Sequence, residues 1–317
     1  MINKTLLILF LISLLILESC DETFSPYGKF EQKYSLNCIV RADTNFQVTT
    51  LFQSYSSNDN TPSQNRSASF VHNAFIRLWR GNDDIYVLKD STIKESDTLH
   101  TSTPINFYYA KNFVPHQNDN LEIEVLLPNG NRLRSKTKVP DLVIKDLVKS
   151  SASIPPISGN MVTFAWRSSE ADEIFVPTLF LIYRQKVGER LIQKKVQIPW
   201  KYVNENGEEV GINRPPTRNQ LVQYSMENIE RVLKSISEGD NNKNNYFILS
   251  ALLEIKIFDR NLSAYYLSTA RITDIYSVSL DSQDYSNING GFGVFGSILE
   301  QKMAILFDND YLAKFGY

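Results

Sequence analysis

The pattern nearest to a known chemical site is a run of glycines close to the end of the chain. Gly291, Gly293 and Gly296 satisfy the spacing G-x-G-x-x-G, in which backbone amides bind a dinucleotide pyrophosphate. That site needs a preceding strand, a following helix and a parallel βαβ unit around it. The preceding Asn287-Ile288-Asn289 is turn-like, and too little chain follows to build the rest. We therefore expect a structural or partner-facing loop without affinity for nucleotides.

Other patterns of catalysis or metal binding are missing from the sequence. The three histidines lie in separate segments without the i, i+4 spacing of paired metal ligands. There is no Gly-x-Ser-x-Gly elbow, no P-loop and no cysteine beside a histidine. Neighbouring acids occur in turn-like stretches, whereas a glycosidase needs two acids several ångströms apart in a cleft. We therefore expect a protein that is not an enzyme and carries no metal or cofactor; the histidines are His72, His100 and His116.

The first twenty residues carry a different chemistry, the attachment of lipid. Lys4 precedes an almost unbroken apolar run from Leu6 to Leu17, as in a secretory signal peptide. A transmembrane helix needs about 20 apolar residues, and Glu18 ends this run well before that. Residues 1–19 are therefore expected to be a cleaved signal peptide.

The end of this run, Leu17-Glu18-Ser19-Cys20, resembles the lipobox of bacterial lipoproteins, although Glu18 stands where a small or apolar residue is usual. The resemblance implies that the Cys20 thiol carries a diacylglycerol and that residues 20–29 form a lipidated tether. Several acyl chains anchor a domain stably, because each buried CH₂ contributes ~0.8 kcal/mol. The alternative is that Cys20 is an ordinary thiol near a cleavage site.

The residues after the cysteine bear on where the anchor lies. Asp21 and Glu22 resemble the surface-export signal of Bacteroidota lipoproteins. In enterobacteria, an aspartate at this position favours retention in the inner membrane instead. We expect an outer-membrane lipoprotein, and we favour the cell surface over the periplasmic face.

Composition favours a mainly β protein without a strong electric field. The chain has 317 residues and a net charge of −2, which loss of residues 1–19 leaves unchanged. Nucleic acid is therefore not an expected partner, since it requires a basic patch. Numerous Phe and Tyr and few Gly favour strands. With Cys20 lipidated, Cys38 has no partner for a disulfide, and its phase with Leu36 and Val40 predicts a place in the core.

The alternation of apolar residues predicts two immunoglobulin-like or fibronectin-type β-sandwich domains in tandem, at residues 30–142 and 143–317. Val139-Pro140 and a following stretch rich in Ser, Ile and Pro mark the boundary. Trp166 is a core candidate in the second domain. One or two helices are inserted there, the main one at about 226–237 with Ser225 as N-cap and Gly239 as C-cap.

The most closely determined local feature is a hairpin around Pro128-Asn129-Gly130. Apolar residues alternate before and after this loop, and their parity selects a loop of three residues. Proline suits the first turn position and Gly130 the left-handed residue of the closing bulge. The resulting register places Val125 opposite Leu133 and Glu124 opposite Arg134.

The glycine run with its flank, from Tyr285 to Gly296, resembles the C-terminal motif of DUF4249, a family of Bacteroidota lipoproteins of unknown function. The residues that carry the motif are Ser286, Asn287, Gly290, Gly291, Gly293, Phe295 and Gly296. Members of that family are commonly found alongside TonB-dependent outer-membrane transporters, which implies a transporter as partner. The resemblance implies no catalytic residues, and the role of the motif is open.

These observations favour a lipid-anchored outer-membrane protein with a non-enzymatic binding or accessory role, whose ligand the sequence does not name. A structural subunit of fimbrial type is the first alternative, with Lys29 and Lys33 as the early basic residues at which processing would occur. An extracytoplasmic hydrolase is the second.

Overall fold

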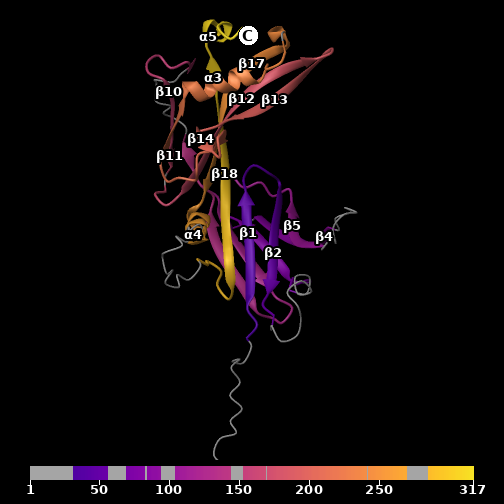
Figure 1. Ribbon diagram of the computed structural model, residues 1–317. Helices are drawn as coiled ribbons and strands as arrows, with labels where there is room; N and C mark the ends of the chain where they lie inside the picture. Colours follow the sequence, from indigo (N-terminus) through magenta and orange to yellow (C-terminus); the bar gives the residue numbers. More distant parts are fainter. Residues whose placement is uncertain are drawn as a thin grey trace, which may run out of the picture.

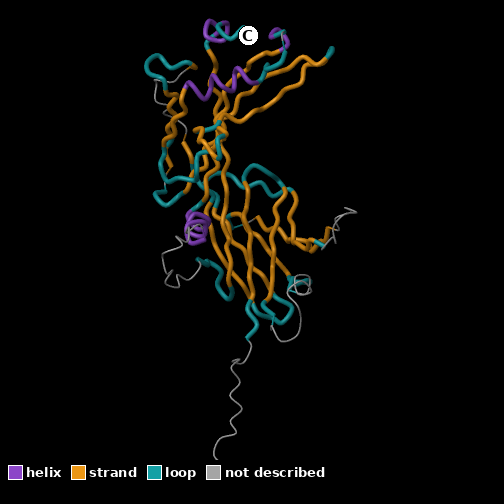
Figure 2. The backbone as a smooth tube through the Cα atoms, viewed as in Figure 1, coloured by secondary structure: helices purple, strands orange, loops and turns teal. Residues whose placement is uncertain are grey.

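The computed structural model describes residues 31–55, 69–82, 84–93, 104–143, 153–168, 170–240, 242–269 and 285–317. The chain is mainly β, as predicted, and is elongated, with a strand-rich body at one end and a second part beyond it (Figures 1 and 2). Cys20 and the whole signal peptide lie outside the described residues, so the lipid attachment stays a prediction.

The first part is a sandwich of two sheets. One sheet contains the start of β18, followed by β1, β2, β5 and the end of β4; the other contains the start of β4, followed by β3, β6 and β7. β4 therefore passes from one sheet to the other. The bounds are β1 Tyr34–Arg41, β2 Phe46–Gln53, β3 Phe75–Arg80, β4 Asp84–Ile93, β5 Ile105–Lys111, β6 Asn120–Leu126 and β7 Arg132–Lys138.

Alternating side chains of these strands fill the space between the two sheets. Leu36, Cys38 and Val40 of β1 are buried, and they face buried residues such as Ile123 and Val125 of β6. This is the period of two that the sequence shows for each strand. The prediction that Cys38 belongs to the core is confirmed, and burial raises the pKa of its thiol to about 12.

One long strand, β18 (Phe292–Phe307), belongs to both parts of the molecule. Its first half runs parallel to β1, with Phe295 opposite Cys38, and its second half runs antiparallel to β17 (Tyr246–Phe258). Figure 1 shows it as the yellow strand between the two parts. A single run of hydrogen-bonded strands thereby continues from the sandwich into the C-terminal part, across the predicted boundary at residues 142/143.

The C-terminal part extends this sheet through β17, β12 (Ile174–Val187) and β13 (Arg190–Ile198). Helix α3 (Met226–Ser235) buries Ile229, Val232 and Leu233, and Trp166 is also buried, as predicted. The remaining elements are β8 Leu142–Val143, β9 Ser153–Ile154, β10 Met161–Ala165, β11 Arg167–Ser168, β14 Lys201–Glu205, β15 Glu208–Ile212, β16 Leu221–Ser225, the 3₁₀ turn η2 Lys243–Asn245, α4 Arg260–Thr269 and α5 Asn309–Ala313.

The predicted hairpin is confirmed residue by residue. Val125 pairs with Leu133 and Glu124 with Arg134, and the amide of Leu127 donates to the carbonyl of Asn131 at 2.9 Å. Gly130 has φ +86°, the left-handed conformation that the bulge requires. Turn chemistry and alternation together fixed this register.

The predicted helix is also present, but one of its ends differs. Ser225 is the N-cap, and its hydroxyl oxygen accepts from the amide of Asn228 at 3.2 Å. Gly239 is not the C-cap, because the helix ends in right-handed geometry at Ile236 and Gly239 instead takes its φ of +79° in the turns that follow. The glycine thus closes a later turn rather than the helix.

The glycine run is the clearest correction to the sequence interpretation. We predicted a loop, whereas residues 292–296 are the start of strand β18. Glycine is rare inside strands because it has no side chain to pack. It occurs there where another part of the backbone approaches closely. The parallel partner β1 makes that approach here, which one-dimensional reading of the sequence could not show.

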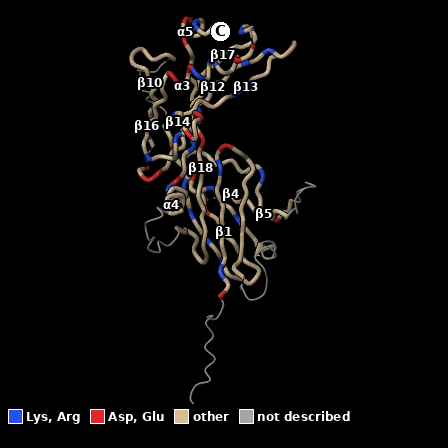
Figure 3. The backbone as a smooth tube through the Cα atoms, in the orientation of Figure 1, with Lys and Arg blue, Asp and Glu red and all other residues tan. Residues whose placement is uncertain are grey.

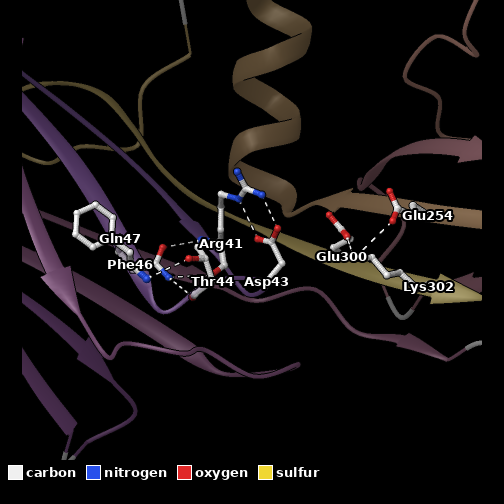
Figure 4. Close-up of polar contacts among 8 residues, drawn as sticks. All are labelled: Arg41, Asp43, Thr44, Phe46, Gln47, Glu254, Glu300 and Lys302. Atoms are coloured by element: carbon white, nitrogen blue, oxygen red, sulfur yellow. Dashed lines mark hydrogen bonds and ion pairs between the residues drawn. The ribbon is translucent and has the colours of Figure 1, made fainter. Parts of the chain in front are cut away.

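The turn between β1 and β2 is fixed by the buried side-chain amide of Gln47 (Figure 4). Gln47 donates through Nε2 to the carbonyls of Arg41 and Thr44, each at 2.9 Å, while its Oε1 accepts from the Arg41 amide at 2.9 Å. Nearby on β17 and β18, Lys302 lies 2.7 Å from Glu300 and 3.5 Å from Glu254. Charged side chains of β17 and β18 therefore lie near this turn.

None of the helices in the described ranges is long and apolar enough to span a bilayer.

Candidate functional site

A cavity of about 340 Å³ opens where the sandwich meets the C-terminal part. We call it the junction cleft. Its walls are the end of β7 with residues 139–141, the segment before β12, and the first turn of α4. Two buried acids, Glu173 and Asp259, lie in these walls together with the basic side chains of Lys136, Lys138 and Arg260.

Asp259 is the N-cap of α4, and its carboxylate accepts hydrogen bonds from three elements. Its Oδ1 accepts from the amide of Leu262 at 2.7 Å, which satisfies one of the free amides of the first helical turn. Its Oδ2 accepts from the amide and the hydroxyl of Ser297 at 2.8 and 3.0 Å, and from the hydroxyl of Thr137. The carboxylate therefore joins α4, β18 and β7.

The pKa of Asp259 reflects two opposing influences. Burial raises it to about 6, although the hydrogen bonds that the carboxylate accepts act in the other direction. Because both of its oxygens are occupied by structural donors, Asp259 has little capacity left for a ligand or a substrate. We assign it a structural role.

Glu173 is 1% exposed and differs from Asp259 in its surroundings. One of its oxygens accepts from the Ser168 hydroxyl. Burial is the main cause that raises the pKa of the Glu173 carboxyl to about 7. The hydrogen bond from Ser168 acts in the other direction, and repulsion from Glu170, Asp259 and Asp141 adds to the effect of burial. A carboxylic acid that exchanges its proton near neutral pH can donate or accept a hydrogen bond towards a molecule in the cleft.

A second cavity of about 430 Å³ lies on the other side of the same helical turn. It shares Arg260 and Asn261 with the junction cleft and is completed by residues that include Arg218 and Tyr285. The Tyr285 hydroxyl donates to Asn261 Oδ1 at 2.8 Å, and Asn261 in turn donates to the carbonyl of Lys136 at 2.9 Å. The start of α4 is thus surrounded by polar side chains on both sides.

The predicted motif residues lie beside these cavities, and the contacts they make are structural. Asn287 pairs with the backbone of Phe295: its Nδ2 donates to the carbonyl at 2.8 Å and its Oδ1 accepts from the amide at 2.9 Å. Ser135 donates to the carbonyl of Asn287 at 2.7 Å, and Asn289 exchanges two backbone bonds with Arg134. Ser286 accepts from the amide of Ile288 at 3.4 Å. These bonds hold the segment against β7.

The motif glycines permit close packing of the backbone. A Cβ at Gly293, where φ is +107°, would collide with the carbonyl oxygen of Leu36 in β1. A Cβ at Gly296 would lie 2.8 Å from the Cβ of Leu262 in α4. A Cβ at Gly290 would lie 2.5 Å from the backbone oxygen of Arg132, and a Cβ at Gly291 would lie 2.7 Å from that of Tyr34.

The structure brings together residues that the sequence did not single out. Glu173 and Asp259 lie far apart in the sequence, and neither was predicted as a site residue. Asp259 had one available signal, since an aspartate three residues before Leu262 fits an N-cap. Within the described part of the chain, no group of three or more His, Cys, Asp or Glu could hold a metal ion.

Comparison with known families gives one match. A family model described as a domain of unknown function, DUF4249, matches residues 21–303. The chain belongs to the DUF4249 family. The match includes the sandwich, both buried acids and the glycine motif, and it confirms the family that the sequence resembled. No curated protein matches the chain.

The packing of the glycine motif in this DUF4249 protein can be tested at Gly293. We expect Gly293→Ala to lower the free energy of unfolding by about 2 to 4 kcal/mol, since it adds backbone strain to a steric overlap with Leu36. Gly81→Ala is the matched control, because Gly81 also has positive φ but has no atom within 4 Å of the added Cβ. Denaturant melts that are equal for the two variants would contradict the close approach.

The pH dependence of unfolding tests the environment of Glu173. Its folded pKa, about 7, exceeds the ordinary 4.5, so the folded state binds more protons than the unfolded chain between these values. The stabilising contribution is complete below the unfolded pKa and is lost as the pH rises through 7. Asp259 contributes in the same direction at lower pH.

Glu173→Gln should therefore flatten the decline in melting temperature between about pH 5 and pH 7.5, because the glutamine amide does not ionise in this range. Glu122→Gln serves as the control, since Glu122 lies on the solvent side of β6 in an ion pair with Lys136. If the melting temperatures of wild type and Glu173→Gln changed equally with pH across this range, the raised pKa assigned to Glu173 would be wrong.

Proposed function

We propose that this DUF4249 protein is a lipid-anchored outer-membrane protein with a non-enzymatic binding or accessory role at the cell surface, acting beside a TonB-dependent transporter. The observation that carries the proposal is Leu17-Glu18-Ser19-Cys20 directly after an apolar run too short to span a membrane. Asp21 and Glu22 support the cell surface rather than the periplasmic face.

The direction of the chain is compatible with an anchor before β1. β1 runs parallel to the first half of β18, whose second half continues into the C-terminal part. The first residue of β1 therefore lies at the side of the sandwich that is remote from the C-terminal part (Figure 1). A tether of about nine residues, at most ~30 Å long, would hold the sandwich near the membrane and direct the C-terminal part outward.

The junction cleft is the place where we expect a small ligand to bind. It lies between the two parts, and the polar side chains around the start of α4 could orient a molecule there. Asp259 is occupied by structural hydrogen bonds, which leaves Glu173 as the acid able to interact with a ligand. One available acid supports binding better than hydrolysis by a carboxylate pair.

A hydrolase remains the second candidate, and one observation favours it. The carboxyl group of Glu173 has a pKa of about 7, which suits a general acid or base. Turnover of a glycoside or ester that Glu173→Gln abolished without lowering the melting temperature would favour this alternative. No corresponding observation favours a fimbrial subunit, because β1 is paired on both sides, by β2 and by β18.

The anchor is tested by changing the cysteine. Cys20→Ala should move the protein from the detergent phase to the soluble fraction, since it removes the atom that carries the lipid. Cys38→Ala is the matched control, because it removes a buried thiol and should leave the protein in the detergent phase. Protease added to intact cells should digest the wild-type protein if it faces outward.

Recovery of unlipidated wild-type protein from the soluble periplasm would contradict the anchor and the transporter-accessory role that depends on it.

A further inference from the structure

The hairpin of β12 and β13 ends the large sheet with an edge that has no strand partner in the described part of the chain. β13 is the terminal strand and pairs only with β12. The hairpin extends away from the rest of the C-terminal part (Figure 1). The outer edge of such a strand carries backbone amide and carbonyl groups that can pair with another chain.

The outer two thirds of β13 are exposed on both faces of the sheet. Residues 190–195 are all exposed, whereas Ile198 at the inner end is buried. Leu191 is 55% and Ile192 is 44% exposed, and Val187 on the neighbouring strand is 51% exposed. Because successive side chains point to opposite faces, Leu191 and Ile192 place apolar groups on both sides of the open edge.

The hairpin is strongly basic in a chain whose net charge is −2. Arg184, Lys186, Arg190 and Lys194 form no ion pair with an acid among the described residues, and Glu189 is the single acid between Arg184 and Lys195. Lys195 lies 2.7 Å from Glu254 and is already paired. Figure 3 shows Lys and Arg positions along this hairpin. The surplus of positive charge therefore lies beside the open edge.

Both faces of the hairpin at β13 carry cations beside an aliphatic group. Arg190, Ile192 and Lys194 share one face, so that face presents two cations around an aliphatic group. Leu191 lies on the other face, directly opposite Lys186 of β12, and Arg184 lies opposite Gln193 on that same face. An added strand that carries both acids and apolar residues would complement this arrangement.

A second copy of this chain fits the edge poorly. Two β13 strands paired antiparallel about Ile192 would place Arg190 of one copy opposite Lys194 of the other. Like charges placed opposite one another across a strand pair are destabilising. The edge is therefore suited to a strand of opposite charge rather than to itself.

We propose that β13 binds an extended acidic segment of a partner protein, which adds to the sheet as a further strand beside residues 190–195. Main-chain hydrogen bonds would supply affinity, and acids opposite Arg190 and Lys194 would supply specificity. The proposal does not rest on the lipid anchor, because strand addition is measured in solution.

The test uses the full chain and a capped synthetic peptide of alternating Glu and Val, about eight residues long, the length of a strand. We expect binding, together with slower amide hydrogen exchange confined to residues 190–195. A control peptide with Pro in place of each Val has the same charge but cannot form the ladder, and it should not protect these amides.

Charge reversal identifies the side chains. Arg190→Glu with Lys194→Glu should weaken binding of the Glu-Val peptide by about ten-fold or more. Lys89→Glu with Lys111→Glu makes the same change in net charge on exposed strand positions of the sandwich and should leave binding unchanged.

Three results would overturn the proposal. Equal binding of the proline peptide, or binding without protection at 190–195, would show charge attraction alone. Protection of the same amides in the absence of peptide, increasing with protein concentration, would assign the edge to a second copy. Absence of any binding by the Glu-Val peptide would show that β13 does not bind an acidic strand.

Discussion

The structure depends on one buried carboxylate, that of Asp259. Burying a charge unpaired is costly, and the cost is offset only if hydrogen bonds replace the lost water. Asp259 receives these bonds from Leu262 at the start of α4, from Ser297 in β18 and from Thr137 in β7. Displacing any of the three elements would leave the carboxylate with too few donors. The same side chain thus positions the helix, the shared strand and the wall of the junction cleft.

The glycine motif follows from the same constraint. For β18 to deliver Ser297 to Asp259, its first half must lie against β1 and beside α4, and this is where Gly293 and Gly296 remove side chains that would collide. Asn287 completes the arrangement by pairing with the backbone of Phe295. The motif therefore builds the junction. The motif residues hold the strands together, whereas Glu173 lines the cleft that we propose as a binding place.

The sequence predicted those features whose causes are local. The β6–β7 register followed from alternation and from Gly130, and the start of α3 followed from the capping side chain of Ser225. The strand at residues 292–296 was missed because its glycines are explained only by the approach of β1, more than two hundred residues earlier. Glu173 was missed for a similar reason: its burial and its acidic neighbours come from packing between distant segments.

A double-mutant cycle between Asp259 and Thr137 tests the role of the buried carboxylate most directly. The free energies of unfolding of wild type, Thr137→Val, Asp259→Asn and the double variant would be measured at pH 7. Because the two side chains share a hydrogen bond inside the junction, we predict a coupling energy of about 1 kcal/mol or more. Strictly additive effects of the two substitutions would contradict the account, since they would show that the hydrogen bond between Thr137 and Asp259 does not stabilise the junction.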